Sequence, residues 1–133
     1  MWFQYQGGSG LHYQWNDQAG GSSGFRMFTN GIAGSGLRVR GIPGGSDLEY
    51  GGNIQTGGWR HIAIVLDDGP GTSRLYVDGN LVAQDSYSGP VDLNGLRVLG
   101  DGGNRNAAGG YDHYRFTTEA IDEDRIQEMS SED

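Results

Sequence analysis

The stretch that most constrains the fold is the run of residues 58–83, GWRHIAIVLDDGPGTSRLYVDGNLVA. In its first half, Ile62 and Ile64 alternate with Ala63 and Val65, which is the two-residue period of a β-strand. Apolar residues occupy both parities, and a strand that is apolar on both faces belongs in the middle of a covered sheet. The sequence therefore predicts a central strand of an all-β protein here.

Two turn signals follow this strand. Residues 67–71, DDGPG, end it, because glycine favours turns and proline cannot donate to a sheet ladder. Asp78-Gly79 then predicts a hairpin in which Tyr76 faces Leu81 and Leu75 faces Val82. The alternative is a turn centred on Gly79-Asn80, which would pair Val77 with Val82. Three antiparallel strands in sequence are expected.

The composition agrees with one all-β domain over residues 1–133. The chain is long enough for a hydrophobic core, and its 26 glycines separate many short apolar runs, as in proteins with frequent turns. It has no cysteine, which excludes disulfides and thiol chemistry. No apolar stretch is long enough to cross a membrane, and no signal peptide precedes the domain, so we expect no membrane insertion.

The charge balance excludes one class of partner and suggests a habitat. Nine basic residues, all arginine, face seventeen acidic ones, which gives a net charge of −8. No basic patch can displace counterions, so nucleic acid is not expected as a partner. The lack of lysine fits either a GC-rich genome or adaptation to high salt, where screening removes acidic self-repulsion. We favour a halophile.

Short strands and one helix are predicted along the rest of the chain. The helix begins after Asp122, a good N-cap, with Ile121 and Ile126 as a hydrophobic staple. The predicted strands are 2–6, 11–15, 25–28, 37–40, 96–99 and 111–116, with irregular segments at 42–53 and 100–110 and the helix at 123–129.

Two separated motifs carry a resemblance to a known family. The first is W-x-H-I-A-I-V-x-D with R-L-Y-V-D-G-x-L-V-A, in residues 59–83; the second is G-Y-D-H-Y-R-F at 110–116, followed by A-I-D at 120–122. Together they resemble the laminin-G-like, concanavalin A-like lectin/glucanase sandwich domains over roughly residues 25–129. The resemblance implies an antiparallel β-sandwich of jelly-roll type with one short C-terminal helix. It implies a binding module more than an activity.

Catalytic chemistry finds little support in the residues. Some glucanases of this broad fold carry paired carboxylates on a strand, whereas the acidic cluster here, Glu119 with residues 122–124, falls at the start of a helix. The histidines His12, His61 and His113 each lack a local motif. We expect that the protein is not an enzyme.

Calcium is the one cofactor that the sequence leaves open. Calcium takes six to eight oxygen ligands, often from loops, and related domains bind it at the rim of the sandwich. Asp101 and Asp112 are the candidate ligands. The alternative is that Asp112 bonds nearby backbone or pairs with Arg115, and that Asp101 is a turn residue; we favour this alternative.

Sugar recognition needs an exposed aromatic face with amide and charged groups beside it. The alternative for Tyr13 and Trp15, which come before the first polar loop, is that both are core residues on one face of a strand. The candidate ligand-binding residues are Tyr13, Trp15, Asn16, Tyr87, Asn104 and Arg105.

These observations predict a non-catalytic recognition or adhesion module. It would bind glycan or protein outside the cell, at a cell surface or at a virion surface. One alternative is a structural, decoration or attachment protein of a halophilic virus, which the absent signal peptide favours if Met1 is the true start. A second alternative is a remnant glycan-active enzyme.

The N-terminus suggests an assembly mode. In related sandwiches, strands that precede the segment like residues 2–6 pair beside the closing strand, here 111–116. The chain begins too late to supply them, so an open sheet edge is expected. The chain's own first residues, the helix at 123–129 or a partner's strand could cover it, and we favour an oligomer or larger assembly.

Overall fold

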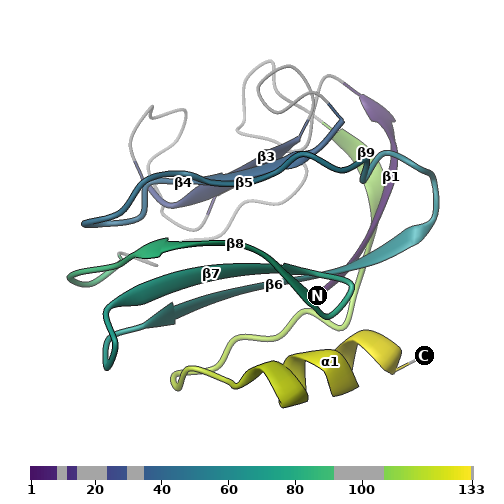
Figure 1. Cartoon of the computed structure of the whole chain (residues 1–133). Helices are drawn as coiled ribbons and strands as arrows, with labels where there is room; N and C mark the ends of the chain where they lie inside the picture. Colours follow the sequence, from purple (N-terminus) through teal and green to yellow (C-terminus); the bar gives the residue numbers. More distant parts are fainter. Residues whose placement is uncertain (9–11, 15–23, 30–34, 92–106, 133) are drawn as a thin grey trace.

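The computed structural model describes residues 1–8, 12–14, 24–29, 35–91 and 107–132. Within them the chain forms two antiparallel sheets that face each other, with one helix outside (Figure 1). The elements are β1 (Trp2–Gly8), β2 (His12–Gln14), β3 (Arg26–Thr29), β4 (Leu37–Arg40), β5 (Leu48–Tyr50), β6 (Trp59–Asp67), β7 (Thr72–Val77), β8 (Asn80–Ser86), β9 (Ala107–Asp112) and α1 (Glu123–Ser131). The predicted antiparallel β-sandwich with one C-terminal helix is confirmed.

The two sheets differ in size and in strand order. The larger sheet runs β8-β7-β6-β1-β9, and the smaller one runs β2-β3-β4-β5. β6 therefore lies centrally in the larger sheet, as its apolar residues on both faces predicted. β1 lies between β6 and β9, with Trp2 opposite His61 on one side and opposite Asp112 on the other.

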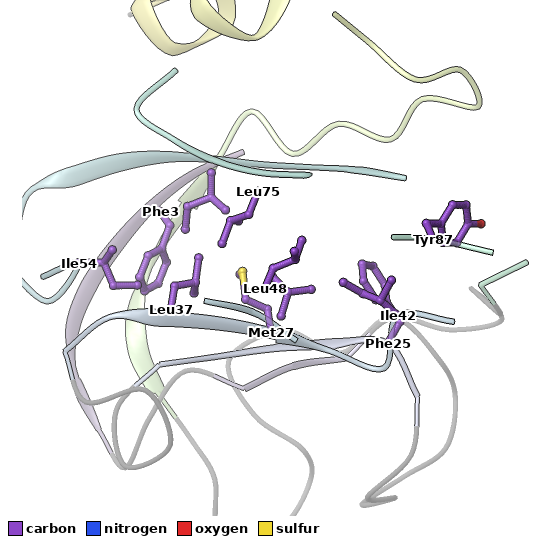
Figure 2. Packing of buried hydrophobic residues seen from close by; sticks show 11 residues of the cluster. Phe3, Phe25, Met27, Leu37, Ile42, Leu48, Ile54, Leu75 and Tyr87 are labelled. Carbon is purple, nitrogen blue, oxygen red and sulfur yellow. The ribbon is translucent and has the colours of Figure 1, made fainter. Parts of the chain in front are cut away.

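The core fills the space between the sheets (Figure 2). Phe3 and Leu75 reach it from the larger sheet, while Met27, Leu37 and Leu48 reach it from the smaller one. All five side chains are essentially removed from solvent. Burial of apolar surface stabilises a fold by about 25 cal/mol for each Å² removed from water, so this cluster favours the folded state.

A second, smaller core lies on the outer face of the larger sheet. Val65 and Tyr76 are buried there against Ile126 of α1. The Asp122 carboxylate accepts a hydrogen bond from the Arg125 backbone N–H at 2.9 Å, and Ile121 packs against the same cluster. The predicted N-cap is confirmed, and both residues of the predicted staple lie in this cluster.

The hairpin of β7 and β8 turns at Asp78-Gly79. Both residues have positive φ, 51° and 79°, the pattern of a two-residue hairpin turn. Tyr76 pairs with Leu81, as predicted. The predicted pairing of Leu75 with Val82 is wrong, because a β-bulge after Leu75 shifts its partner to Ala83.

The last strand begins earlier than the sequence predicted. β9 covers residues 107–112, whereas 113–116, expected to be strand, lie outside the sheet, and the chain turns away at His113, which has a φ of 46°. The glycines of this strand explain why the sequence pattern did not predict its start. A Cβ at Gly109 would collide with the Gln4 carbonyl oxygen, and one at Gly110 would lie 2.8 Å from Trp59 Cη2. Glycine is required for this close packing but gives no apolar period.

β5 was also missed, since residues 42–53 were expected to be irregular. The strand has three residues, of which only Leu48 is buried, so the sequence shows too few alternations to reveal it. The strand predicted at 96–99 lies outside the described residues.

Candidate functional site

Most of the sequence-predicted ligand residues cannot be placed. Trp15, Asn16, Asn104 and Arg105 lie outside the described residues, as does the candidate calcium ligand Asp101. Tyr13 lies in β2, where its backbone pairs with Met27 of β3.

The two remaining candidates lie far apart in the fold. The Tyr87 ring is 8% exposed and packs in the main core, so it has no free face for stacking on a sugar. Asp112 ends β9 and is exposed, and its carboxylate accepts a 2.7 Å hydrogen bond from the His113 backbone N–H. Arg115 pairs instead with Glu132. Among the described residues, no three acidic or histidine side chains are grouped to hold a metal.

The acidic cluster near the C-terminus has a structural role in the described chain. Asp122 caps α1, and Glu123 and Asp124 follow in its first turn, where the helix dipole favours anions. Their arrangement along a helix start does not bring two carboxylates together across a cleft.

A cavity of about 360 Å³ opens beside β6. One wall is formed by six consecutive residues of β6, 61–66, and the other by five consecutive residues after β9, 113–117. The rest of the lining is Met1, Trp2, Phe25, residues 119–121, Arg125 and Met129 of α1, and Glu132. In β6, Ile62 and Ile64 face the main core, whereas Ala63 and Val65 face α1. Residues of both faces line the cavity, so the cavity lies beside β6 in the plane of the larger sheet.

The charges around the cavity largely cancel. Arg115 donates to Glu132 at 3.0 Å, and Glu132 lies 3.6 Å from Arg125. Arg125 also pairs with Glu128 at 2.8 Å. The apolar lining and these internally paired charges suit an uncharged ligand.

His61 lies on the cavity wall and is 3% exposed. Its ring packs edge-on against Trp2 with centroids 5.4 Å apart, and Nδ1 has no hydrogen-bond partner among the described residues. Burial lowers the pKa of His61 to about 4; the Met1 amine and Arg115 add to this effect, while Asp78 and Glu132 oppose it. The imidazole is therefore neutral at physiological pH.

A second feature that the sequence analysis missed lies on the outer face of the larger sheet. Trp59 is 46% exposed, and its indole lies against Gly110 across the strand between them. Gln4 occupies that intervening strand opposite both residues, and Gln6 donates to its side-chain oxygen at 2.9 Å. The sequence gives no local sign of this feature, because Trp59 and Gly110 are far apart in the chain and only strand pairing brings them together.

The fold and this site define a class of protein. The family model described as "Concanavalin A-like lectin/glucanases superfamily", of laminin G type, matches residues 1–127. The chain belongs to this superfamily, and it has the fold of a binding module.

One solved structure gives the same picture. The binding domain of Paraclostridial Mosquitocidal Protein 1 is similar, with a TM-score of 0.58 and 14% sequence identity. The match covers 97% of this chain and 35% of that one, so this chain spans about a third of that structure's length. The likeness shows the shared fold. Among curated proteins, none matches this chain significantly. No helix in the described part is both long and apolar enough to cross a membrane.

Proposed function

We infer that this domain is a non-catalytic module that recognises another protein through the cavity beside β6. The observation that supports this is an apolar opening in the plane of a sheet, lined by Ile62, Ile64 and Leu66 on one side and Tyr114 and Phe116 on the other. Phe116 is exposed at its rim, and an apolar opening with an exposed aromatic side chain is typical of protein contacts.

The surroundings agree with binding rather than hydrolysis. The cavity contains Glu119 and Glu132, but Glu132 pairs with Arg115 and Arg125. Among the residues that the structure describes, no further acidic side chain lines this cavity to complete an acid–base pair with Glu119. A remnant glycan-active enzyme is the less favoured alternative, and hydrolysis that survives neutralising Glu119 and residues 122–124 would show that catalysis was misjudged.

We place the module at a cell surface or on a virus particle, in a saline habitat. Its superfamily and its acidic, lysine-free composition support this placement. A decoration or attachment protein of a halophilic virus is a specific form of the same proposal.

Site-specific photocrosslinking tests the partner class. A photoreactive side chain at Phe116, which is 58% exposed at the cavity rim, is compared with one at Leu81, which is 42% exposed on β8 and does not line the cavity. The domain is mixed in molar salt with surface proteins of the organism that it comes from. The photoreactive side chain at position 116 should then crosslink to one polypeptide, which mass spectrometry identifies, and the Tyr114→Asp substitution should abolish this crosslink. Equal labelling from both positions, or none, overturns the proposal.

Glycan binding is the second candidate, and Trp59 favours it. The exposed indole lies against Gly110, with Gln4 on the strand between them and Gln6 bonded to Gln4, and an exposed indole beside side-chain amides suits the stacking of a sugar ring. A glycan array of the wild-type domain and of Trp59→Ala tests this. Binding lost in the variant supports it, and silence on halophile surface sugars counts against it.

A further inference from the structure

Residues 113–132 lie outside the two sheets (Figure 1). The chain turns away from β9 at His113, whose positive φ of 46° is uncommon for a residue with a side chain, and continues to α1 on the outer face of the larger sheet. Between 113 and 132, Ile126 is the one residue that is buried. This segment therefore covers part of the sheet while burying little of itself.

A few apolar side chains attach the segment to the rest of the domain. Ile126 is fully buried in the smaller core, where Ile121 and Met129 are half-buried. At the other end of the segment Tyr114, also half-buried, packs against the main core. Because the free energy of attachment grows with the apolar area removed from water, these anchors hold the segment less firmly than the main core holds the two sheets together.

The ion pairs of the segment join its own residues. Arg115 donates to Glu132 at 3.0 Å, and Arg125 lies 2.8 Å from Glu128 and 3.6 Å from Glu132. Both partners of each pair belong to residues 113–132. Movement of the whole segment away from the sheet would therefore break none of these pairs.

We propose that residues 113–132 form a hinged lid, which opens as one unit about His113 while the two sheets stay folded. Residues at the end of an element that absorb a change in backbone angles act as such hinges. The open state exposes Val65 and Tyr76, which the closed lid buries, so the closed state is favoured.

The lid also governs the cavity beside β6. Residues 113–117 form one of its walls, so opening the lid takes this wall away. Control of recognition by the lid rests on the function proposed above, whereas the opening itself does not depend on any partner.

Amide hydrogen exchange measures the opening. A helix of nine residues is not stable alone in water, so the α1 amides exchange once the lid leaves the sheet. They should be protected about a hundredfold less than the slowest amides of β6 and β7, which exchange only when the sheets separate. Low urea should accelerate exchange in these strands and hardly change it in α1, because opening exposes little surface. Equal protection and equal urea dependence in α1 and in the strands overturn the proposal.

Three variants test whether the lid is one unit. Ile126→Ala removes the buried anchor and should speed exchange in α1 at least tenfold. Tyr114→Ala removes the anchor at the other end and should speed exchange in α1 at least threefold. Val39→Ala weakens the main core, so it should speed exchange in β6 and β7 but leave α1 unchanged. An equal effect of Val39→Ala on α1 and the strands, or no effect of Tyr114→Ala on α1, overturns the proposal.

A charge at the buried anchor holds the lid open. Ile126→Asp would bury a carboxylate in the closed state, so the open state should predominate and α1 should lose its protection, while the sheets still unfold cooperatively. Thr118→Asp places the same charge at an exposed lid residue outside the cavity lining and should leave exchange unchanged. Loss of cooperative unfolding in Ile126→Asp, or the same loss of protection in both variants, overturns the proposal.

Photocrosslinking from position 116 links the lid to recognition. The wild-type crosslink to a surface protein should fall at least tenfold in Ile126→Asp and persist in Thr118→Asp. An unchanged crosslink in Ile126→Asp overturns the control of the cavity by the lid. No crosslink in the wild type, together with the expected hydrogen exchange, contradicts the proposed function and supports the lid.

Discussion

At the scale of single residues, His61 couples the cavity to pH. It is buried beside Trp2 with an unpartnered Nδ1 among the described residues, so protonation must place a charge in a poorly solvated position. The unfolded chain, in which histidine has its ordinary pKa near 6.5, binds this proton more readily.

The sign of the pH effect follows from this difference. The His61 pKa is lowered to about 4 in the folded domain, so its contribution to stability is complete above about pH 6.5 and is lost as pH falls towards 4. Between pH 7.5 and 5 the loss is about 2 kcal/mol. Urea unfolding at both pH values should show this loss in the wild type and a smaller one in His61→Phe.

His113→Phe provides the matched control, since His113 lines the same cavity but has an exposed side chain. This variant should keep the wild-type pH dependence. A wild type and His61→Phe with the same loss between the two pH values would show that His61 is not the responsible group.

At the scale of elements, the β7–β8 turn supports α1. A Cβ at Gly79 would lie 2.5 Å from Ser130 Oγ and 3.3 Å from Gln127 Cα, so the turn and the helix are in close contact. The end of α1 therefore depends on the absence of a side chain at Gly79, which lies about fifty residues earlier in the chain.

Two glycine substitutions separate backbone strain from this contact. Gly79 and Gly57 have almost the same φ, 79° and 76°, but a Cβ at Gly57 meets no atom within 4 Å. Gly57→Ala should cost about 1 kcal/mol through backbone strain alone. Gly79→Ala should cost about 1–2 kcal/mol more, because α1 must shift. Chemical denaturation measures both.

The double variant Gly79→Ala/Ser130→Ala removes the nearest obstructing atom. It should recover part of the loss, while the remaining contact with Gln127 Cα keeps it below the wild type. Equal costs for Gly79→Ala and Gly57→Ala would contradict a close contact between turn and helix.

At the scale of the whole molecule, the net charge of −8 opposes folding in dilute buffer. Molar salt shortens the screening length to about 3 Å and relieves this repulsion. The thermal midpoint should therefore rise by about 5 °C or more between about 0.1 M and 2 M potassium chloride. An unchanged or lower midpoint would contradict the halophile proposal.

A charge-reduced variant distinguishes screening from general salt effects. Asp68→Asn with Glu119→Gln neutralises two exposed carboxylates and should reduce the dependence of the midpoint on salt. Calcium at constant ionic strength is a separate comparison, and a specific rise with calcium would support the candidate ligands Asp101 and Asp112.

The sequence by itself determined the elements that local chemistry encodes. The alternation in β6, the Asp78-Gly79 turn and the Asp122 cap are properties of a few adjacent residues, and together with two motifs they gave the sandwich and its helix. The expectation of an open edge beside the closing strand also came from the sequence, and the structure pairs β9 on one side with β1, the chain's own first residues.

Only the tertiary structure decided what depends on pairing between distant segments. β9 is a strand because Gly109 and Gly110 fit against Gln4 and Trp59, and no period in its own sequence reveals this. Tyr87 is buried because two sheets close over it. β1 lies between β6 and β9, with Trp2 opposite both His61 and Asp112, and this register is one that no local pattern specifies.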